Sequence, residues 1–486
     1  MAFGGIHYPR RKRSAWSMWQ NVGPRWLPFA DAATEDLPLG RLLRLCMFQI
    51  SVGMATVLLT GTLNRVMIVE LGVVTSLVAA MIAIPVLAAP FRVLIGYRSD
   101  TFKSVLGWRR VPYIWLGSML QFGGLAIMPF ALLLLQSQTT GPEWAGPAGA
   151  ALAFLLTGIG MHMTQTAGLA LATDLAAPDN RPRVVALAYV MLLVGMMVSA
   201  VAFGWMLADF DAITLIRVVQ GAAVATLVIN GIALWKQEPR NAELTRADRA
   251  VPTFREAFTG YCKDNRTVRL LVAVALGAAG FAMQDVLLEP YGGEVLGLSV
   301  SATTLLTAIW AAGTLVGFAL AGRWLAMGRD MYRLAGLGAM IGVVAFSAVV
   351  FAEPLQSPTL FRIGTALIGL GGGLFAVCTM LAAMEVSDTT DSGIAIGAWG
   401  AVQATAIGVG LALGGFIRDA VNFAVEAGMT GSALSAPAAG YGVVYHIEIG
   451  LLFASLVALG PLVGRARRRS TDHQPIRRFG IAELPG

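Results

Sequence analysis

Charged residues are scarce in this chain: Asp, Glu, Lys and Arg make up only 13% of its 486 residues, whereas 56% are hydrophobic. Soluble proteins carry about 25% charged residues, so this composition predicts a chain that faces lipid. Lys and Arg (35) outnumber Asp and Glu (28). We expect this positive excess to follow membrane topology rather than to bind nucleic acid.

Cysteine and histidine are also rare. Three cysteines are too few for a disulfide framework or a cysteine metal cluster, and the four histidines show no metal-ligand spacing. The sequence contains no P-loop, nucleophile elbow, HExxH motif or dinucleotide fingerprint. We therefore expect no metal site and no enzyme activity.

Long apolar runs dominate what remains, and each is long enough to cross a bilayer as a helix, which takes roughly 20 residues. They predict an all-α polytopic membrane protein with twelve transmembrane helices. The predicted spans are 43–63, 73–95, 111–135, 148–173, 184–207, 213–235, 268–288, 301–322, 334–352, 359–382, 393–415 and 444–464.

The distribution of positive charge predicts the orientation. If the N-terminus is cytoplasmic, 31 of the 35 Lys and Arg residues lie on the cytoplasmic side. The other four are Arg65, Arg217, Arg362 and Arg418. Because cytoplasmic loops are enriched in Lys and Arg, we expect both termini to be cytoplasmic.

The chain repeats itself. Glu70–Thr75 resembles Val295–Val300, and the same offset aligns Asn64 with Glu289. Two parallel six-helix halves joined by a basic loop are typical of major facilitator transporters. The predicted divisions are a basic cytoplasmic arm (1–40), an N-terminal half (41–235), a cytoplasmic linker (236–267), a C-terminal half (268–464) and a basic cytoplasmic tail (465–486). The connection 417–441 is long enough for a short interfacial helix.

The first candidate site is a charged turn between the second and third spans. Gly96 and Asp100 match the opening of the major facilitator loop signature, although its basic cluster comes late. We expect ion pairs here to act as a conformational latch between the halves, or to serve only folding and topology. The predicted latch residues are Arg98, Asp100, Arg109, Arg110, Asp174, Arg183 and Glu385.

Two further groups lie within the spans. His162, in the middle of the fourth span with Gln165 nearby, could ligate the magnesium of a chlorophyll-type ring or bond to a neighbouring helix. Asn64 is a further candidate for binding such a ring. Arg65, Asp285 and Glu289, near the non-cytoplasmic ends of the first and seventh spans, form a predicted outer gate or proton site, or are interface residues that snorkel to water.

Several stretches of the sequence indicate a particular family more specifically than the loop signature at Gly96 and Asp100 does. Leu27–Ala32, Gly61–Leu71, Gln165–Leu175 and Arg181–Leu187 resemble the PucC/LhaA family, a branch of the major facilitator superfamily in purple phototrophs. The resemblance implies an assembly factor in the bacterial photosynthetic inner membrane. Such a factor would bind bacteriochlorophyll as cargo and deliver it to light-harvesting antenna polypeptides.

The resemblance leaves alternatives open. We favour the core antenna LH1, with the reaction centre as a further partner, although the quoted residues do not separate core from peripheral antenna. One alternative is a proton-coupled transporter of a small amphipathic solute that uses Asp285 or Glu289. Another is a structural chaperone that binds no ligand.

Overall fold

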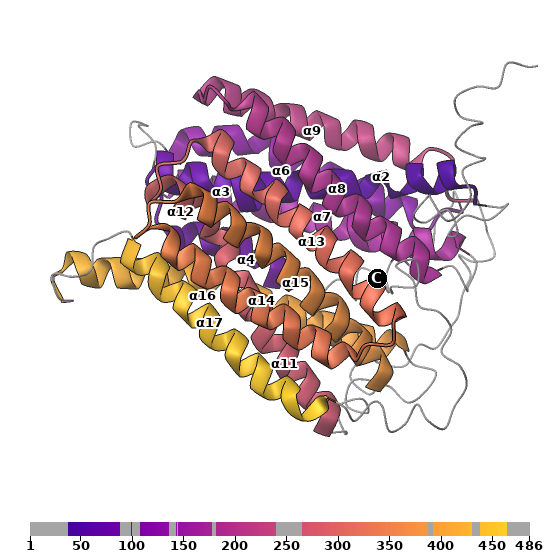
Figure 1. Cartoon of the computed structure of the whole chain (residues 1–486). Helices are drawn as coiled ribbons and strands as arrows, with labels where there is room; N and C mark the ends of the chain where they lie inside the picture. Colours follow the sequence, from indigo (N-terminus) through magenta and orange to yellow (C-terminus); the bar gives the residue numbers. More distant parts are fainter. Residues whose placement is uncertain are drawn as a thin grey trace, which may run out of the picture.

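The computed structural model describes residues 37–87, 99, 107–135, 142, 144–176, 181–239, 265–386, 392–429 and 438–463. Regular secondary structure over the described residues is helical throughout. The long helices run side by side along one common direction (Figure 1).

The N-terminal half begins with one long helix that changes its winding. It consists of α2 (Leu39–Thr56), the π-helical η2 (Val57–Thr62), α3 (Leu63–Arg65) and the π-helical η3 (Val66–Glu70). The remaining helices of this half are α4 (Thr75–Leu87), α6 (Val111–Leu135), α7 (Ala145–Leu175), α8 (Arg181–Met206) and α9 (Ala212–Leu234).

The C-terminal half also begins with an interrupted helix: α11 (Asn265–Ala282), the 3₁₀ segment η7 (Met283–Val286) and α12 (Leu288–Glu294). The rest of this half consists of α13 (Val300–Ala326), α14 (Met331–Ala352), α15 (Pro358–Val386), α16 (Ser392–Glu426), α17 (Ala438–Leu459) and η8 (Gly460–Leu462).

Eleven helices in the described part of the chain are long and apolar enough to cross a membrane, and the shorter apolar helix Thr75–Val86 occupies the position of the second predicted span. The prediction of an all-α polytopic membrane protein with two six-helix halves is confirmed. The short interfacial helix expected in the connection 417–441 stays a prediction. The first residues of this connection continue α16, which has 35 residues and is about 50 Å long.

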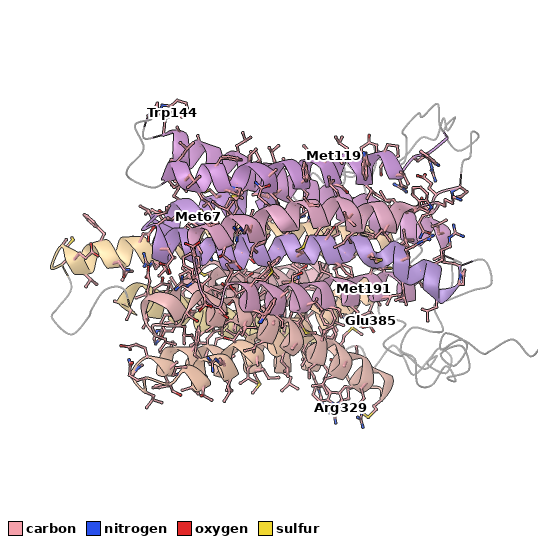
Figure 2. The ribbon with its side chains drawn as sticks, turned by 90° about the horizontal axis from the view of Figure 1, so that it is seen from above. Met67, Met119, Trp144, Met191, Arg329 and Glu385 are labelled. Carbon is pink, nitrogen blue, oxygen red and sulfur yellow. The ribbon has the colours of Figure 1, made fainter. Side chains whose placement is uncertain are left out.

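We call the end of the bundle where α2 begins and α17 ends the terminal end, and the opposite end the far end. Figure 2 shows Arg329 and Glu385 toward the terminal end, and Met67 and Trp144 toward the far end. The ribbons of the two halves converge toward the far end and diverge toward the terminal end (Figure 1).

Glycines let the halves touch near the far end. A side chain at Gly415 of α16 would overlap Ala79 of α4, and one at Gly204 of α8 would lie 3.1 Å from Leu305 of α13. Small residues at helix interfaces allow such close backbone approach in membranes. The described contacts therefore join the halves at the far end.

Candidate functional site

The centre of the molecule is built around two interrupted helices, one from each half. In α12, Pro290 has no N–H, and its ring displaces the helical carbonyl four residues earlier, which belongs to Val286. Asn64, on the first helix of the other half, donates its side-chain amide to this Val286 carbonyl at 2.9 Å. The carbonyl group at the helix break of one half thus accepts a hydrogen bond from a side chain of the other half.

The first helix of the N-terminal half changes from α-helical to π-helical winding beside this break. The hydroxyls of Thr56 and Thr60 donate to the carbonyls of Val52 and Thr56, each at 2.9 Å, and so compete with the regular ladder. The π-helical segment η2 starts within this stretch. π-Helical turns occur frequently at functional sites, and interrupted helices line the binding sites of many transporters.

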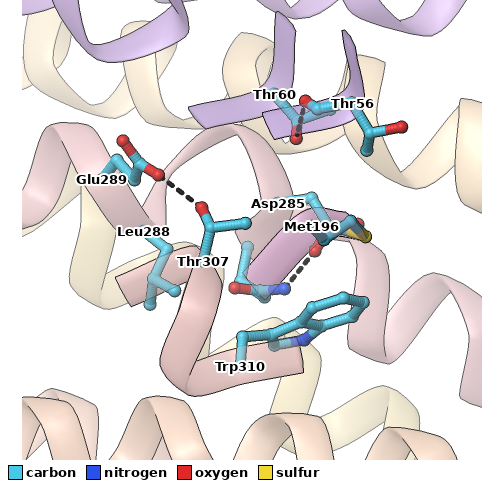
Figure 3. Close-up of a pocket in the computed structure, with 9 residues that line it drawn as sticks. Thr56, Thr60, Met196, Asp285, Leu288, Glu289, Thr307 and Trp310 are labelled. Carbon is cyan, nitrogen blue, oxygen red and sulfur yellow. Dashed lines mark hydrogen bonds between the residues drawn. The ribbon is translucent and has the colours of Figure 1, made fainter. Parts of the chain in front are cut away.

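A cavity of about 100 Å³ lies between the two interruptions (Figure 3). Polar side chains from both halves line it, together with three larger apolar ones. The lining residues are Thr56, Thr60, Met196, Gln284, Asp285, Leu288, Glu289, Thr307 and Trp310.

Glu289 is the best-defined carboxylate of this cavity. It is 4% exposed, and its Oε1 accepts a 2.6 Å hydrogen bond from Thr307. Its Oε2 has no described hydrogen-bond partner. Gly61 makes room for it, because a side chain at that position would overlap Glu289 Oε1. Asp285, one turn earlier, accepts a hydrogen bond from Gln284.

Arg65 lies beside this cavity on the far-end side. Its ion pair, at 2.5 Å, is with Glu70 of the same helix, and Nη2 donates to the Leu298 carbonyl of the other half at 3.2 Å. It also interacts electrostatically with Glu289. The structure thus brings the predicted outer group to one junction between the first and seventh helices, where Arg65 contacts both halves.

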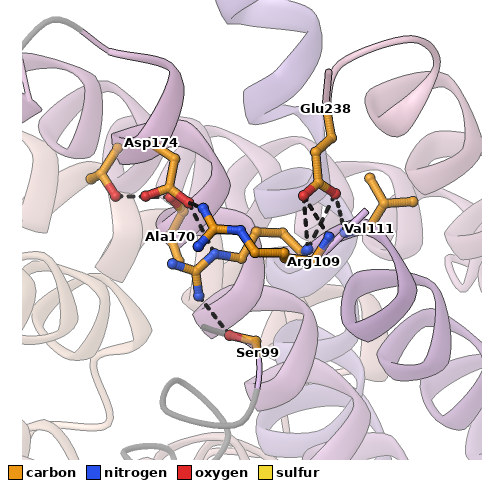
Figure 4. Close-up of polar contacts among 8 residues, drawn as sticks. Ser99, Arg109, Val111, Ala170, Asp174 and Glu238 are labelled. Carbon is orange, nitrogen blue, oxygen red and sulfur yellow. Dashed lines mark hydrogen bonds and ion pairs between the residues drawn. The ribbon is translucent and has the colours of Figure 1, made fainter. Parts of the chain in front are cut away.

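At the terminal end, the predicted latch residues make contacts within single halves. Arg110 and Arg109 of the N-terminal half pair with Asp174 at the end of α7, at 3.0 and 3.5 Å (Figure 4). Arg110 also donates to Ser99 at 2.6 Å. These ion pairs join the start of α6 to the end of α7 within one half; pairing between the halves when the cytoplasmic side is closed stays a prediction.

Glu238, which no sequence motif marks, holds the backbone of Arg109 and Arg110 in place. It lies just after α9 and accepts hydrogen bonds from the backbone N–H groups of Arg109 (2.7 Å), Arg110 (3.1 Å) and Val111 (2.8 Å). A carboxylate at a helix N-terminus satisfies free N–H groups and complements the helix dipole. The start of α6 is therefore fixed to the end of α9.

The remaining latch residues are not brought to this cluster. Arg98, Asp100 and the side chain of Arg183 lie outside what the structure describes. Glu385 is exposed at the end of α15, in the C-terminal half. Partial desolvation and the negative charge of Asp330 raise its pKa above the usual value.

The predicted pigment residues fall into two places. Gln165 of α7 donates to Gln49 of α2 at 3.3 Å, and His162 is half-buried one turn earlier. Asn64 lies 15 residues beyond Gln49 on the same helix, which is about 20 Å. Gln165 and Asn64 therefore cannot hold the same metal ion.

A second group of charges at the far end was also missed. Arg418 of α16 pairs with Glu294 of α12 and, at 3.0 Å, with Asp419. Asp419 accepts a hydrogen bond from the backbone N–H of Ser76, at the start of α4 in the other half, at 2.5 Å. The sequence placed Arg418 on this side of the membrane, but only the fold reveals its partners.

Residues 62–467 match the family model described as PUCC protein. The chain belongs to this family. It is 59% identical over 95% of its length, and 97% of the relative, to an "uncharacterized protein in puhA-bchM intergenic region" of Rhodobacter capsulatus. It is 58% identical over 82% of its length, and 89% of the relative, to a protein PucC of Rhodovulum sulfidophilum.

A more distant relative, at 27% identity over 88% of this chain and 97% of its own length, is the "bacteriochlorophyll synthase 44.5 kDa chain" of Rhodobacter capsulatus. Among solved structures, a bacterial homolog of the lysosomal transporter Spinster in an inward-facing conformation matches with a TM-score of 0.64 at 15% identity, covering 90% of this chain and 98% of that one. A mutant of the nucleoside transporter NupG matches with 0.63 at 14%, covering 87% and 100%. The chain has the major facilitator fold.

Proposed function

We propose that this PucC-family chain is an assembly factor for the light-harvesting apparatus, which binds bacteriochlorophyll and delivers it to antenna polypeptides of the core complex LH1. The observation that carries this is the 58% identity to a protein PucC over most of both chains. The name of the distant relative, which includes bacteriochlorophyll, supports the choice of cargo. The role is non-catalytic, in keeping with the transporter fold.

The size of the central cavity bears on where such a cargo would bind. Pockets for drug-sized ligands measure roughly 300–1,000 Å³. The cavity between the halves has about 100 Å³, which is too small for a tetrapyrrole. We therefore place the pigment outside this cavity, on a side of the bundle that antenna helices could approach laterally, and keep the half-buried His162 of α7 as its candidate ligand.

Membrane orientation is part of the proposal. The terminal end, which carries Arg109, Arg110 and Arg329, is taken as the cytoplasmic side of the bacterial inner membrane, because Lys and Arg concentrate in cytoplasmic loops. Both chain termini are then cytoplasmic. Labelling of single cysteines introduced near residues 10 and 475 in intact and permeabilised spheroplasts tests this.

The test of the main proposal is purification in mild detergent from cells that are assembling antenna. We expect an absorption spectrum with a bound bacteriochlorophyll and co-purification of LH1 polypeptides. If the folded protein carries neither pigment nor antenna polypeptides under these conditions, the proposal fails. Recovery of peripheral antenna polypeptides instead would overturn the assignment to LH1.

A second candidate, proton-coupled transport of a small amphipathic solute, is favoured by one observation. Asp285 and Glu289 line a cavity between two interrupted helices, as proton and substrate sites do in transporters of this fold. It predicts solute flux in proteoliposomes that Asp285→Asn or Glu289→Gln abolishes. A chain that binds pigment but shows no proton-dependent flux would exclude it.

A further inference from the structure

The inner face of α17 carries polar groups that neither the family match nor the cavity explains. Tyr441, Tyr445 and Glu448 are spaced by four and three residues, so they lie on one face of the helix. All three are 0% exposed. Glu448 is the single carboxylate of this apolar helix, and ionisable groups within membrane spans are costly and usually functional.

Glu448 uses only one of its two oxygens in the described structure. Oε1 accepts a 2.7 Å hydrogen bond from the backbone N–H of Gln284, which the 3₁₀ segment η7 leaves available. Oε2 has no described partner. The hydrogen bond from the Gln284 N–H group does not by itself account for an acid at position 448, because a neutral acceptor such as the side-chain oxygen of glutamine could accept it equally well. A buried carboxylate oxygen without a hydrogen-bond partner is very unfavourable when charged, which makes Oε2 a candidate proton-binding atom.

Titratable groups lie on both sides of Glu448. Asp285, which follows Gln284 and lines the central cavity, interacts with it electrostatically. Tyr445, one turn toward the far end, interacts electrostatically with it as well. The Tyr445 hydroxyl likewise has no described hydrogen-bond partner. Two unpaired polar atoms thus occupy one buried region beside a cavity that holds an acid.

From Tyr445 the polar groups continue to the far end. The ring of Tyr291 lies edge-on to the rings of Tyr445 and Tyr441, with centroids 5.6 and 5.3 Å apart. The Tyr441 hydroxyl donates to Glu294 at 2.8 Å, and Glu294 pairs with Arg418. The side chain of Glu294 is 18% exposed, so this series of groups reaches the surface of the protein.

We propose that Asp285, Glu448, Tyr445, Tyr441 and Glu294 form a proton path through the C-terminal half, with Glu448 as its central proton-binding group. A proton leaves the Asp285 carboxyl group and binds the Glu448 carboxylate. It then passes by way of the two tyrosine hydroxyls to the Glu294 carboxylate, or the series runs in reverse. Each step moves one proton, and no electron is transferred.

The spacing of these groups sets how the proton moves. Tyr441 and Glu294 are hydrogen-bonded directly at 2.8 Å, whereas the Tyr445 hydroxyl and Oε2 of Glu448 have no described hydrogen-bond partner, so transfer between these two needs a bridging molecule. Buried waters bind to polar atoms that would otherwise be unsatisfied. Oε2 of Glu448 and the hydroxyl of Tyr445 are such atoms, and a water between them would bridge this step; the transfers between Asp285 and Glu448 and between Tyr445 and Tyr441 require bridging waters in the same way.

The surroundings contain both signs of charge. Phe346 of α14 stacks on Tyr445, and Glu353 at the end of α14 interacts electrostatically with Tyr291. The other groups that face the polar side of α17 are Asp285 from η7, Tyr291 and Glu294 from α12, and Arg418 and Asp419 from α16. The described cation, Arg418, is at the far end. Glu448 is therefore flanked by acids and phenols, which can exchange protons with it.

The path has a consequence for a bundle whose halves meet at the far end. It runs through the C-terminal half alone and does not use the contacts between the halves, such as Asn64 with Val286. Protons could then exchange between the cavity and the far side while the junction stays closed to larger molecules. This inference does not depend on the proposed cargo.

Infrared difference spectroscopy of the full-length protein in nanodiscs tests the path. We expect a protonated-carboxyl band that shifts in D₂O without unfolding, changes with pH and is lost in Glu448→Gln. We also expect the D₂O shift to be slowed in Tyr445→Phe, which keeps the ring against Tyr291 and Phe346 and removes only the hydroxyl. Ser455→Ala, on the same face of α17 but beyond the path, is the matched control.

Two results would overturn the proposal. One is a spectrum of Glu448→Gln identical to that of the native protein, which would mean that Glu448 carries no such proton. The other is a Glu448 band that exchanges equally fast in Tyr445→Phe, in Ser455→Ala and in the native protein, which would mean that protons reach it by another route. Because Tyr445→Phe leaves the Gln284 hydrogen bond untouched, it is informative even if Glu448→Gln folds poorly.

Discussion

The side-chain amide of Asn64 donates to the backbone carbonyl of Val286 across the two halves of the protein, at 2.9 Å. Both groups are buried, and the carbonyl lies four residues before Pro290, where the helical hydrogen bond is missing. The contact therefore links the interruption of one half to the first helix of the other. It also provides the first of five predictions.

Asn64→Ala removes the only described side-chain donor to this carbonyl. We expect a loss of about 1–3 kcal/mol in stability, the usual cost of leaving a buried polar group unsatisfied. Thermal unfolding in detergent measures it. Asn64→Ala combined with Pro290→Ala should cost less than Asn64→Ala alone, because alanine at 290 can supply an N–H to Val286. Equal losses in both variants would contradict this account.

Gly61→Ala tests the fit of Glu289 against the first helix. A Cβ at this position would overlap Glu289 Oε1, which is held by Thr307. We expect a loss of about 1–3 kcal/mol from overpacking. Gly123→Ala, where a Cβ would meet nothing within 4 Å, is the matched control and should be stable. Unchanged unfolding of Gly61→Ala would show that Glu289 moves away freely.

Glu238→Ala should release the start of α6 from the end of α9. Three backbone N–H groups lose their acceptor, and a charge at a helix N-terminus contributes typically 0.3–1 kcal/mol. Hydrogen exchange read by mass spectrometry should show faster exchange at residues 109–111. Glu238→Gln, which keeps one acceptor oxygen, should show a smaller effect. Unaltered exchange in Glu238→Ala would contradict the assignment.

The pKa of Glu385 gives a prediction of pH dependence. Desolvation and Asp330 raise this pKa in the folded state, so the folded protein favours the protonated acid. The contribution of Glu385 to the free energy of unfolding is then fully present at pH values below the ordinary carboxyl pKa. It is lost as the pH rises through the raised pKa of the folded state. Glu385→Gln should raise the unfolding temperature slightly at neutral pH and leave it unchanged at acidic pH. The effect will be small, because water screens an exposed group; a lower unfolding temperature at neutral pH would refute it.

His162→Ala tests the proposed pigment ligand. If the half-buried imidazole of His162 ligates the central magnesium of the cargo, the variant should fold normally but lose most of the bound pigment during purification. The absorption spectrum of the purified variant measures this. Gln165→Ala, one turn further along α7, removes the other predicted pigment residue of this helix and should lose less pigment than His162→Ala, because the Gln165 side chain is engaged with Gln49. Unchanged pigment in His162→Ala would exclude it as the ligand.

The helices could be predicted because long apolar runs have one stable form in lipid. The internal repeat also pointed to the junction at Asn64 and Glu289, since equivalent positions of two related halves meet at the centre. Glu448 could have been found as well, because a carboxylate inside an apolar run is a signal in itself.

Other features depended on distances that the sequence does not contain. Glu238 lies in a polar segment where many charges are solvated, and only the fold places it at the start of α6, 128 residues away from Arg110. Because Glu238 fixes the backbone of Arg109 and Arg110, it also determines that their side chains reach Asp174. Shared depth in the membrane suggested a pairing between the halves in the closed state, but depth alone does not say which of several acids is nearest to each arginine in the described structure.

Three contacts between the halves share a form: a side chain of one half hydrogen-bonds to the backbone of the other. Asn64 meets Val286, Arg65 meets Leu298, and Asp419 meets Ser76. A backbone group is present whatever residue occupies its position. In an alignment of relatives, the donor and acceptor side chains of these contacts should be retained while the residues opposite vary independently. Methods that infer contacts from correlated substitutions would therefore overlook this junction.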